Sequence, residues 1–137
     1  MKKVAVIAVL TLLAGLAVMA QNTKTDTAEK GAESWLALVD KGDYEASYDQ
    51  ASSMFKSALT QDKWVGTLKT VRSPLGKLDS RKLLHAQYTT QLPGAPDGEY
   101  VVIQYQTSFE NKQEAVETVV MQREKDGQWK TSGYFIK

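Results

Sequence analysis

The chain contains no cysteine and only one histidine, His85, among its 137 residues. Without cysteine no disulfide can stabilise the fold, so stability has to come from packing. A zinc site needs several imidazole or thiolate ligands, and one histidine argues against such a site. The sequence also lacks a calcium-binding loop, a phosphate-binding glycine loop and a dinucleotide-binding fingerprint. We therefore predict neither a metal nor a cofactor.

The sequence also has no large excess of charge of one sign, since 17 basic residues stand against 16 acidic ones and the two signs are interspersed along the chain. Proteins that bind nucleic acids or anionic membranes usually concentrate basic residues on one surface. We predict neither partner. With 42% apolar residues and three prolines, the chain is typical of one globular domain with a substantial core.

The amino terminus has the pattern of a secretory signal peptide. Two lysines follow Met1, residues 4–18 are almost entirely apolar, and small or aliphatic residues at 17–20 precede the polar Gln21. We predict a signal peptide over residues 1–20, with cleavage after Ala20. Removal of the two lysines leaves 15 basic residues against 16 acidic ones, so the net charge would become −1.

A retained membrane anchor is the alternative reading of this segment. Its apolar run of about 15 to 17 residues falls short of the roughly 20 residues that a spanning helix needs. The lipid-modified class of bacterial signal peptide requires a cysteine at the cleavage point, and the chain has none. We expect a periplasmic or secreted protein with no stable membrane anchor after cleavage.

Apolar residues recur at helical spacing through the first half of the chain after a short polar tether, residues 21–26. The single domain, residues 27–137, is expected to begin with a helix that ends near Gly42. A second helix should start at Asp43 as its N-cap and continue to Phe55. A third should open at Thr60 or Asp62 and stop before Pro74. The prediction is three helices.

The second half alternates with the period of β-strands, separated by turns rich in glycine, proline, asparagine and aspartate. The expected strands are residues 83–90, 100–109, 115–123 and 128–136. Within the last, Trp129 and Thr131 should face the helices and Tyr134 the opposite side. Helices followed by antiparallel strands indicate an α+β fold, with three N-terminal helices packed on a curved antiparallel sheet of about four strands.

Several segments carry a resemblance to a known family. They are Trp35-Leu36-Ala37-Leu38-Val39-Asp40, Gly42-Asp43-Tyr44, Arg72-Ser73-Pro74-Leu75-Gly76, Pro93-Gly94-Ala95-Pro96-Asp97-Gly98-Glu99-Tyr100, Glu117-Thr118-Val119 and Ser132-Gly133-Tyr134. Together they resemble the exported bacterial family catalogued as domain of unknown function 4019. The order of elements is similar to the cystatin-like cone of nuclear transport factor two and ketosteroid isomerase. The resemblance implies a fold and an exported location, but no reaction.

Candidate site residues follow from the expected concave face of the sheet. We expect Tyr88, Tyr105, Phe109 and Met121 to line it, and His85 could act as a base or orient a water molecule. We assign no catalytic residue. Isomerase chemistry of the related fold would need an aspartate base, and no aspartate falls on the expected inner strand positions. Asp40 and Asp49 fit a solvated helix face.

Two functions of different classes remain open at this stage. The favoured one is a non-catalytic exported module that binds a small molecule, a peptide or a protein on the concave face. The alternative is a small acid/base enzyme that uses tyrosine and His85, or a carboxylate placed by a different strand register. Association into a homodimer through sheet faces is a third alternative.

Overall fold

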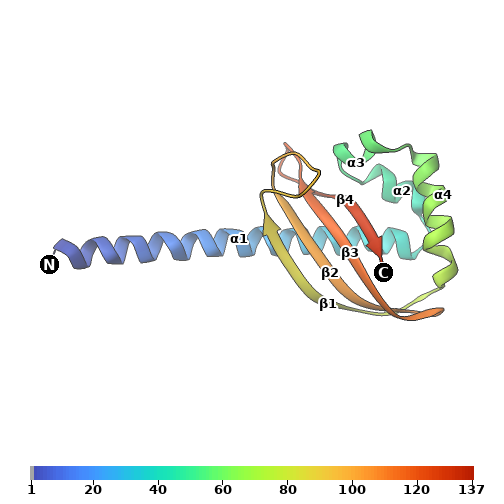
Figure 1. Ribbon diagram of the computed structural model, residues 1–137, viewed down its shortest axis with the longest axis horizontal. Helices are drawn as coiled ribbons and strands as arrows, with labels where there is room; N and C mark the ends of the chain where they lie inside the picture. Colours follow the sequence, from blue (N-terminus) through green and yellow to red (C-terminus); the bar gives the residue numbers. More distant parts are fainter. Residues whose placement is uncertain (1) are drawn as a thin grey trace.

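A computed structural model describes the backbone of residues 2–137 and the side chains of residues 18–137. The elements are helices α1 (Lys2–Asp40), α2 (Tyr44–Asp49), α3 (Ser53–Ala58) and α4 (Gln61–Val71), the 3₁₀ turn η1 (Ser73–Leu75), and strands β1 (Leu78–Thr89), β2 (Tyr100–Phe109), β3 (Lys112–Arg123) and β4 (Trp129–Ile136). The second half of α1 lies along one face of the sheet, and α2, α3 and α4 gather at one end (Figure 1). The α+β class and the four antiparallel strands agree with the sequence prediction.

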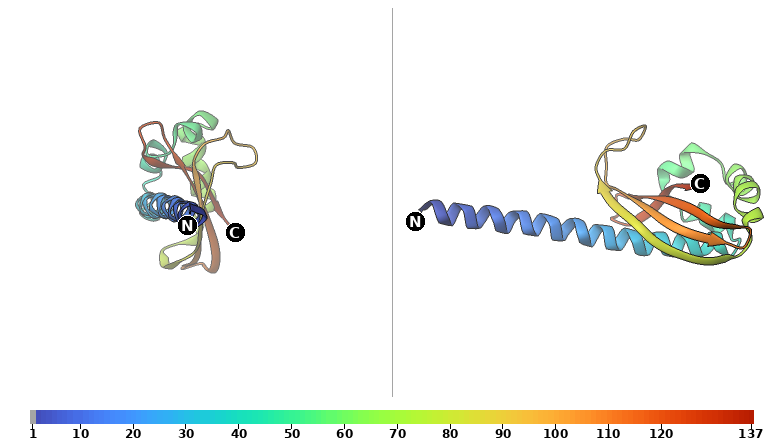
Figure 2. Two further views of the ribbon diagram at one scale, coloured as in Figure 1. Left: turned by 90° about the vertical axis from the view of Figure 1, so that its left-hand side faces the viewer. Right: turned by 60° about the horizontal axis from the view of Figure 1, so that its bottom comes forward.

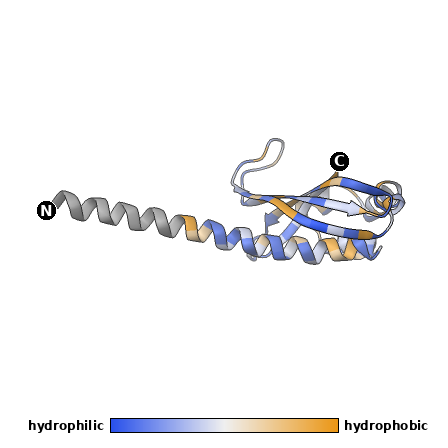
Figure 3. Cartoon of the chain, turned by 90° about the horizontal axis from the view of Figure 1, so that it is seen from below, coloured by the Kyte–Doolittle hydropathy of each residue, from blue (hydrophilic) through white to orange (hydrophobic). Residues whose placement is uncertain are grey.

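Helix α1 is continuous through residues 21–26, which the sequence led us to expect as a tether. Its first half projects beyond the sheet, as Figure 1 and the right-hand view of Figure 2 show. Hydropathy changes abruptly along it, because a hydrophobic turn at residues 18–20 is followed by a hydrophilic stretch (Figure 3). Over the described part of the chain, no helix combines the length and hydrophobicity needed to cross a membrane. The side chains of residues 1–17, most of the predicted signal peptide, lie outside the described side chains.

The second predicted helix is two short helices, so the expected count of three is wrong. Ser52 lies between α2 and α3, and its hydroxyl accepts a hydrogen bond from the backbone N–H of Phe55, which starts α3 anew. The N–H of Ser52 donates to the carbonyl of Thr131 on β4 at 2.8 Å. Asp43 does precede α2, but its side chain makes no capping hydrogen bond. Thr60 caps α4 as predicted.

The sheet has the order β1-β2-β3-β4, with every neighbouring pair antiparallel. Its inner face packs on α1, whereas the outer face carries half-buried or exposed residues such as Gln104 and Thr118. Residues are buried alternately along β2 and β3, as half-covered strands require. β1 starts five residues before the predicted position, at Leu78.

An irregularity in β4 corrects the predicted direction of one side chain. The register shifts between Met121↔Thr131 and Val120↔Gly133, so Ser132 is an extra residue in β4. Such a bulge reverses the alternation of side chains beyond it. Tyr134 therefore lies on the inner face, where its ring contacts Trp35 edge to face at 5.3 Å, and the prediction that it points away is wrong.

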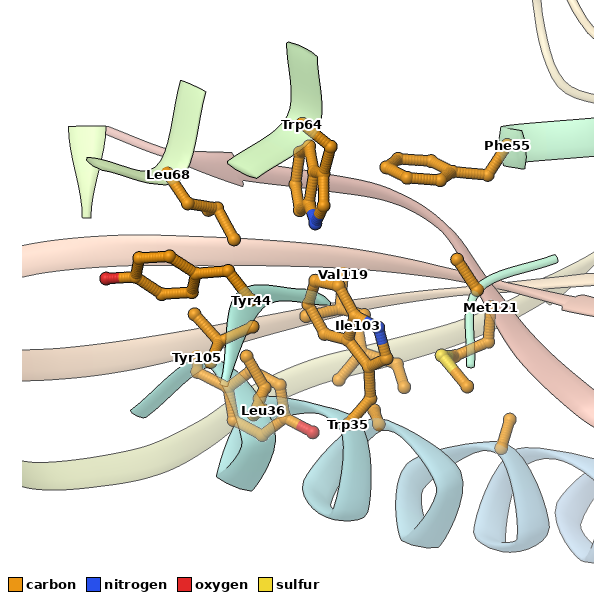
Figure 4. Close-up of a cluster of buried hydrophobic side chains, with 14 of the residues drawn as sticks. Trp35, Leu36, Tyr44, Phe55, Trp64, Leu68, Ile103, Tyr105, Val119 and Met121 are labelled. Carbon is orange, nitrogen blue, oxygen red and sulfur yellow. The ribbon is translucent and has the colours of Figure 1, made fainter. Parts of the chain in front are cut away.

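The core lies between α1, the short helices and the inner sheet face (Figure 4). Its aromatic centre consists of Trp35, Phe55 and Trp64, which pack with ring centroids 4.8 to 6.2 Å apart. Both indole N–H groups are satisfied within the core, because Trp35 donates to the carbonyl of Ser47 and Trp64 to the Ser47 hydroxyl. Aromatic packing and paired N–H groups thus fill the space between the helices and the sheet.

Candidate functional site

The structure does not bring the five predicted site residues together. Tyr105, Phe109 and Met121 are buried in the core, with at most 3% of each side chain exposed. Tyr88 is half-buried on the inner face, next to α1. His85 is exposed on the outer face opposite Gln104, and its nearest hydrogen-bond partner is the Gln87 side chain at 3.4 Å. Of the five, Met121 lines the cavity described next.

An open cavity of about 390 Å³ lies beside β4, between α1 and α2. Trp35, Leu38, Met121 and Trp129 give it apolar and aromatic walls. The other lining residues are Gly31, Ser34, Ala46, Gln50, Gln128, Lys130 and Thr131. Gly31 lets α1 approach β4 closely, because a side-chain carbon there would lie 3.4 Å from the Trp129 carbonyl oxygen. The cavity thus combines apolar walls with amide and hydroxyl groups, as small-molecule sites do.

A second candidate is a group of paired charges at the other end of the inner sheet face. Glu117 is completely buried, and its carboxylate accepts hydrogen bonds from the Arg81 Nε at 2.7 Å and the Thr107 hydroxyl at 2.6 Å. The Tyr134 hydroxyl donates to its other oxygen. Strands β1, β2, β3 and β4 each contribute one of these residues.

The same group extends to the end of α1 through Asp40. The Arg81 guanidinium binds the Asp40 carboxylate with two hydrogen bonds, at 2.8 and 3.0 Å, and Arg72 approaches it at 3.3 Å. Arg72 also donates to the Gly76 carbonyl and stacks on the Phe109 ring at 4.4 Å. The negative charges of Asp40 and Glu117 are therefore balanced by the positive charges of Arg72 and Arg81, as buried charges require.

Two tyrosines of this region hold their protons strongly, for related reasons. Burial, followed by the charge of Glu117 and the hydrogen bond to it, raises the pKa of Tyr134 well above its usual range. Burial, with smaller contributions from Glu33 and Glu29, raises the pKa of Tyr105 to about 12. Neither phenol can serve as a base near neutral pH. The Tyr105 hydroxyl is buried without a hydrogen-bond partner in the described structure.

Glu117, Arg81, Arg72 and Asp40 were not identified as a group from the sequence, and Asp40 does not lie on a fully solvated helix face as predicted. One signal was available for Glu117. It stands among Ala115, Val119 and Met121 at the buried alternate positions of β3, where a carboxylate needs a buried partner. No pattern in the sequence indicates that Arg81 is that partner, since it lies 36 residues away.

A third group joins the middle of α1 to the sheet. The Glu99 carboxylate accepts hydrogen bonds from Lys24 at 2.6 Å, Arg123 at 2.9 Å and the Tyr88 hydroxyl at 3.0 Å. The hydrogen bond from Lys24, reinforced by those from Arg123 and Tyr88 and opposed by burial, lowers the pKa of Glu99 to about 2. These partly exposed ion pairs hold α1 on the sheet at Lys24, ahead of the buried part of the helix, which begins at Ala28.

Comparison with known families matches residues 31–134, from Gly31 in the C-terminal part of α1 to Tyr134 of β4, to a family described as a protein of unknown function (DUF4019). The chain belongs to this family. The range shared with DUF4019 includes the cavity beside β4 and all members of the buried charge group. Comparison with curated proteins finds no match. The function of this DUF4019 protein therefore has to be inferred from its own residues.

Proposed function

We propose that this DUF4019 protein is an exported, non-catalytic module that binds a small apolar molecule in the cavity beside β4. The observation that carries the proposal is the cavity itself, about 390 Å³ in volume and open to solvent. This volume is within the range of small-molecule sites. Trp35, Leu38 and Trp129 offer apolar and aromatic contact area, and the Gln50 amide can fix the orientation of one polar substituent.

Export is the second part of the proposal, and it is supported by the sequence of residues 1–20. The helices and curved sheet are proposed to form the cystatin-like cone of nuclear transport factor two relatives. The intact mass of the protein recovered from the periplasm of a host with an outer membrane tests the export. We expect a chain that begins at Gln21. A chain that begins at Met1 and fractionates with the membrane would instead support the retained anchor.

The acid/base enzyme is the alternative, and one observation favours it. A carboxylate, Glu117, lies beside a tyrosine, Tyr134, on the inner sheet face. Against this, Glu117 has no exposed surface, and its oxygens already accept hydrogen bonds from Arg81, Thr107 and Tyr134. A general base has to reach a proton on a substrate. The described contacts leave Glu117 no access to one, so binding is the better supported function.

The cavity is tested with the fluorescent apolar probe N-phenyl-1-naphthylamine. We expect its emission to rise on addition of the protein, because the probe would enter the space between Trp35 and Trp129. Ser34 is an exposed residue of the cavity lining, so Ser34→Phe should fill the space without disturbing the core and abolish the rise. Ala37→Phe, at an exposed α1 position outside the lining, is the matched control and should bind as the parent does. Equal probe binding by both variants would contradict the proposal.

A further inference from the structure

Strand β4 is an edge of the sheet, and part of that edge has no backbone partner. Val116 and Lys137 exchange two backbone hydrogen bonds, of 3.0 and 2.9 Å. In an antiparallel pair the bonded residues alternate with residues whose N–H and C=O point the other way. Tyr134 and Ile136 therefore direct their backbone groups away from β3. Among the described residues, no turn or loop donates to or accepts from them.

The upstream part of the same edge already pairs with another segment of the chain. The N–H of Ser52, between α2 and α3, donates to the Thr131 carbonyl at 2.8 Å. The chain then turns into α3, so this pairing consists of one hydrogen bond. The edge is therefore able to accept backbone hydrogen bonds, and the chain leaves it unpaired beyond Ser132.

An apolar groove of about 270 Å³ runs beside this unpaired part, on the helix side of the sheet. Phe55 and Trp64 form one wall, with their rings edge to face at 4.8 Å. The remaining lining residues are Met54, Ala58, Leu59, Ser132, Gly133, Tyr134 and Phe135. None of the lining residues is charged. The groove is distinct from the cavity between α1 and α2, since the two share no lining residue.

The outer face of β4 is basic, in contrast to the groove. Lys130 lies opposite Gln122 and Lys137 opposite Val116 on that face, and neither lysine forms an ion pair within the described chain. Phe135 lies between them and is 62% exposed. Two acidic residues adjoin these positions in the sequence of the β3 side: Glu114, two positions before Val116, and Glu124, two positions after Gln122, whose carboxylate accepts a hydrogen bond from the Ser53 N–H. An added strand would place alternate side chains beside these lysines.

We propose that the free edge of β4 from Ser132 to Ile136 binds an extended peptide segment of another protein as a fifth strand. Its backbone pairs with Tyr134 and Ile136. Alternate side chains of the peptide are apolar and enter the groove, and those between them are acidic and lie beside Lys130 and Lys137. Backbone pairing supplies affinity in this mode of recognition, and the alternating contacts supply specificity. The proposal does not depend on the small-molecule cavity, because the groove shares no lining residue with it, and Lys130, the one residue common to both sites, directs its side chain to the outer face.

The test uses the protein purified from its own host. Two fluorescein-labelled octapeptides serve as probes, one that alternates valine with glutamate and one that alternates valine with lysine. We expect fluorescence anisotropy to show binding of the glutamate peptide and at least tenfold weaker binding of the lysine peptide. Amide exchange at Tyr134 and Ile136 should slow when the glutamate peptide is added. No binding of the glutamate peptide, or equal binding of both, overturns the proposal.

Variants of Ile136 separate backbone pairing from side-chain contact. Ile136→Pro removes the outward N–H but leaves the bonds from Phe135 and Lys137 to β3, so the sheet should persist. We expect about tenfold weaker binding of the glutamate peptide, the order of one lost hydrogen bond. Ile136→Ala, which keeps the N–H, is the matched control and should bind as the parent. Parent-like binding by a proline variant with an intact circular dichroism spectrum overturns the proposal.

Charge reversal tests the outer face, and light scattering tests a competing occupant. The double variant Lys130→Glu/Lys137→Glu should prefer the lysine peptide, whereas Lys82→Glu, on the same face at the opposite edge, should keep the preference for the glutamate peptide.

Loss of peptide binding in Ser34→Phe would place the peptide in the other cavity and overturn the proposal. A dimer that dissociates on Ile136→Pro would assign the edge to a second copy, and would overturn it as well.

Discussion

The Tyr134 hydroxyl donates a hydrogen bond to the buried carboxylate of Glu117, across the pairing of β3 with β4. Glu117 is opposite Ile136 in the register, so Tyr134 reaches it diagonally from two residues away on the same face. The bulge at Ser132 makes this contact possible, because it turns Tyr134 inward. A local irregularity in one strand thus completes the shell of donors around a buried charge.

Removal of the Glu117 carboxylate should be among the most destabilising single changes in the sheet. Glu117→Ala leaves the Arg81 guanidinium with Asp40 as its remaining carboxylate partner. The Thr107 and Tyr134 hydroxyls lose the carboxylate that accepts their hydrogen bonds. We expect a loss of about 3–5 kcal/mol in the free energy of unfolding. Urea denaturation measures it. Glu114→Ala, at an exposed position of the same strand, should change stability by less than about 0.5 kcal/mol. Similar values for the two variants would contradict a structural role for the buried charges.

Two tyrosines of the inner face, Tyr134 and Tyr105, should respond oppositely to loss of the hydroxyl. Tyr134→Phe deprives the Glu117 carboxylate of a donor, and should cost about 1.5–3 kcal/mol. The Tyr105 hydroxyl is buried without a partner, so Tyr105→Phe removes an uncompensated polar group and should be neutral or stabilising by about 1 kcal/mol. Denaturation midpoints of the two variants at pH 7 compare them directly. A larger loss for Tyr105→Phe would show that its hydroxyl has a partner in solution.

The sequence could predict much of the sheet but little of the charge group, for different physical reasons. Alternation along residues 100–109 depends on neighbouring residues, and the observed β2 has those bounds. The split of the second helix depends on Ser52, whose N–H bonds to Thr131 nearly 80 residues later. The charged partner of Glu117, Arg81, is likewise distant, 36 residues earlier, and no local pattern specifies it. The direction of Tyr134 depends on one extra residue in β4, which alternation alone does not reveal.

Ser52 should contribute measurably to stability, because it starts α3 and also holds the α2–α3 junction against β4. Ser52→Ala removes the hydroxyl that accepts from the Phe55 N–H, but keeps the backbone bond to Thr131. We expect a cost of about 1 kcal/mol, typical of a lost N-cap. Ser53→Ala is the control, since that residue is exposed and its side chain makes no cap bond. Thermal unfolding compares the stability of both variants. A Ser52→Ala variant as stable as the parent would show that α3 does not need its cap.

The attachment of α1 through Glu99 should weaken in acid. The pKa of Glu99 is about 2 in the folded protein against an ordinary value of 4.5. Its contribution is therefore complete above about pH 4.5 and is lost as the pH falls toward 2. Because the Lys24 and Glu99 side chains are 34% and 28% exposed, solvent and salt limit the contribution to about 1 kcal/mol.

Glu99→Gln tests this attachment, because the amide cannot titrate. At pH 7 it should be less stable than the parent, and amides near Lys24 and Ala28 should exchange faster, since they lie where α1 first meets the sheet. The stability difference should shrink as the pH approaches 2. Asp97→Asn, an exposed change in the same loop, should show no such trend. A stability difference that stays constant from pH 7 to pH 2 would mean that the Glu99 charge does not hold α1 on the sheet.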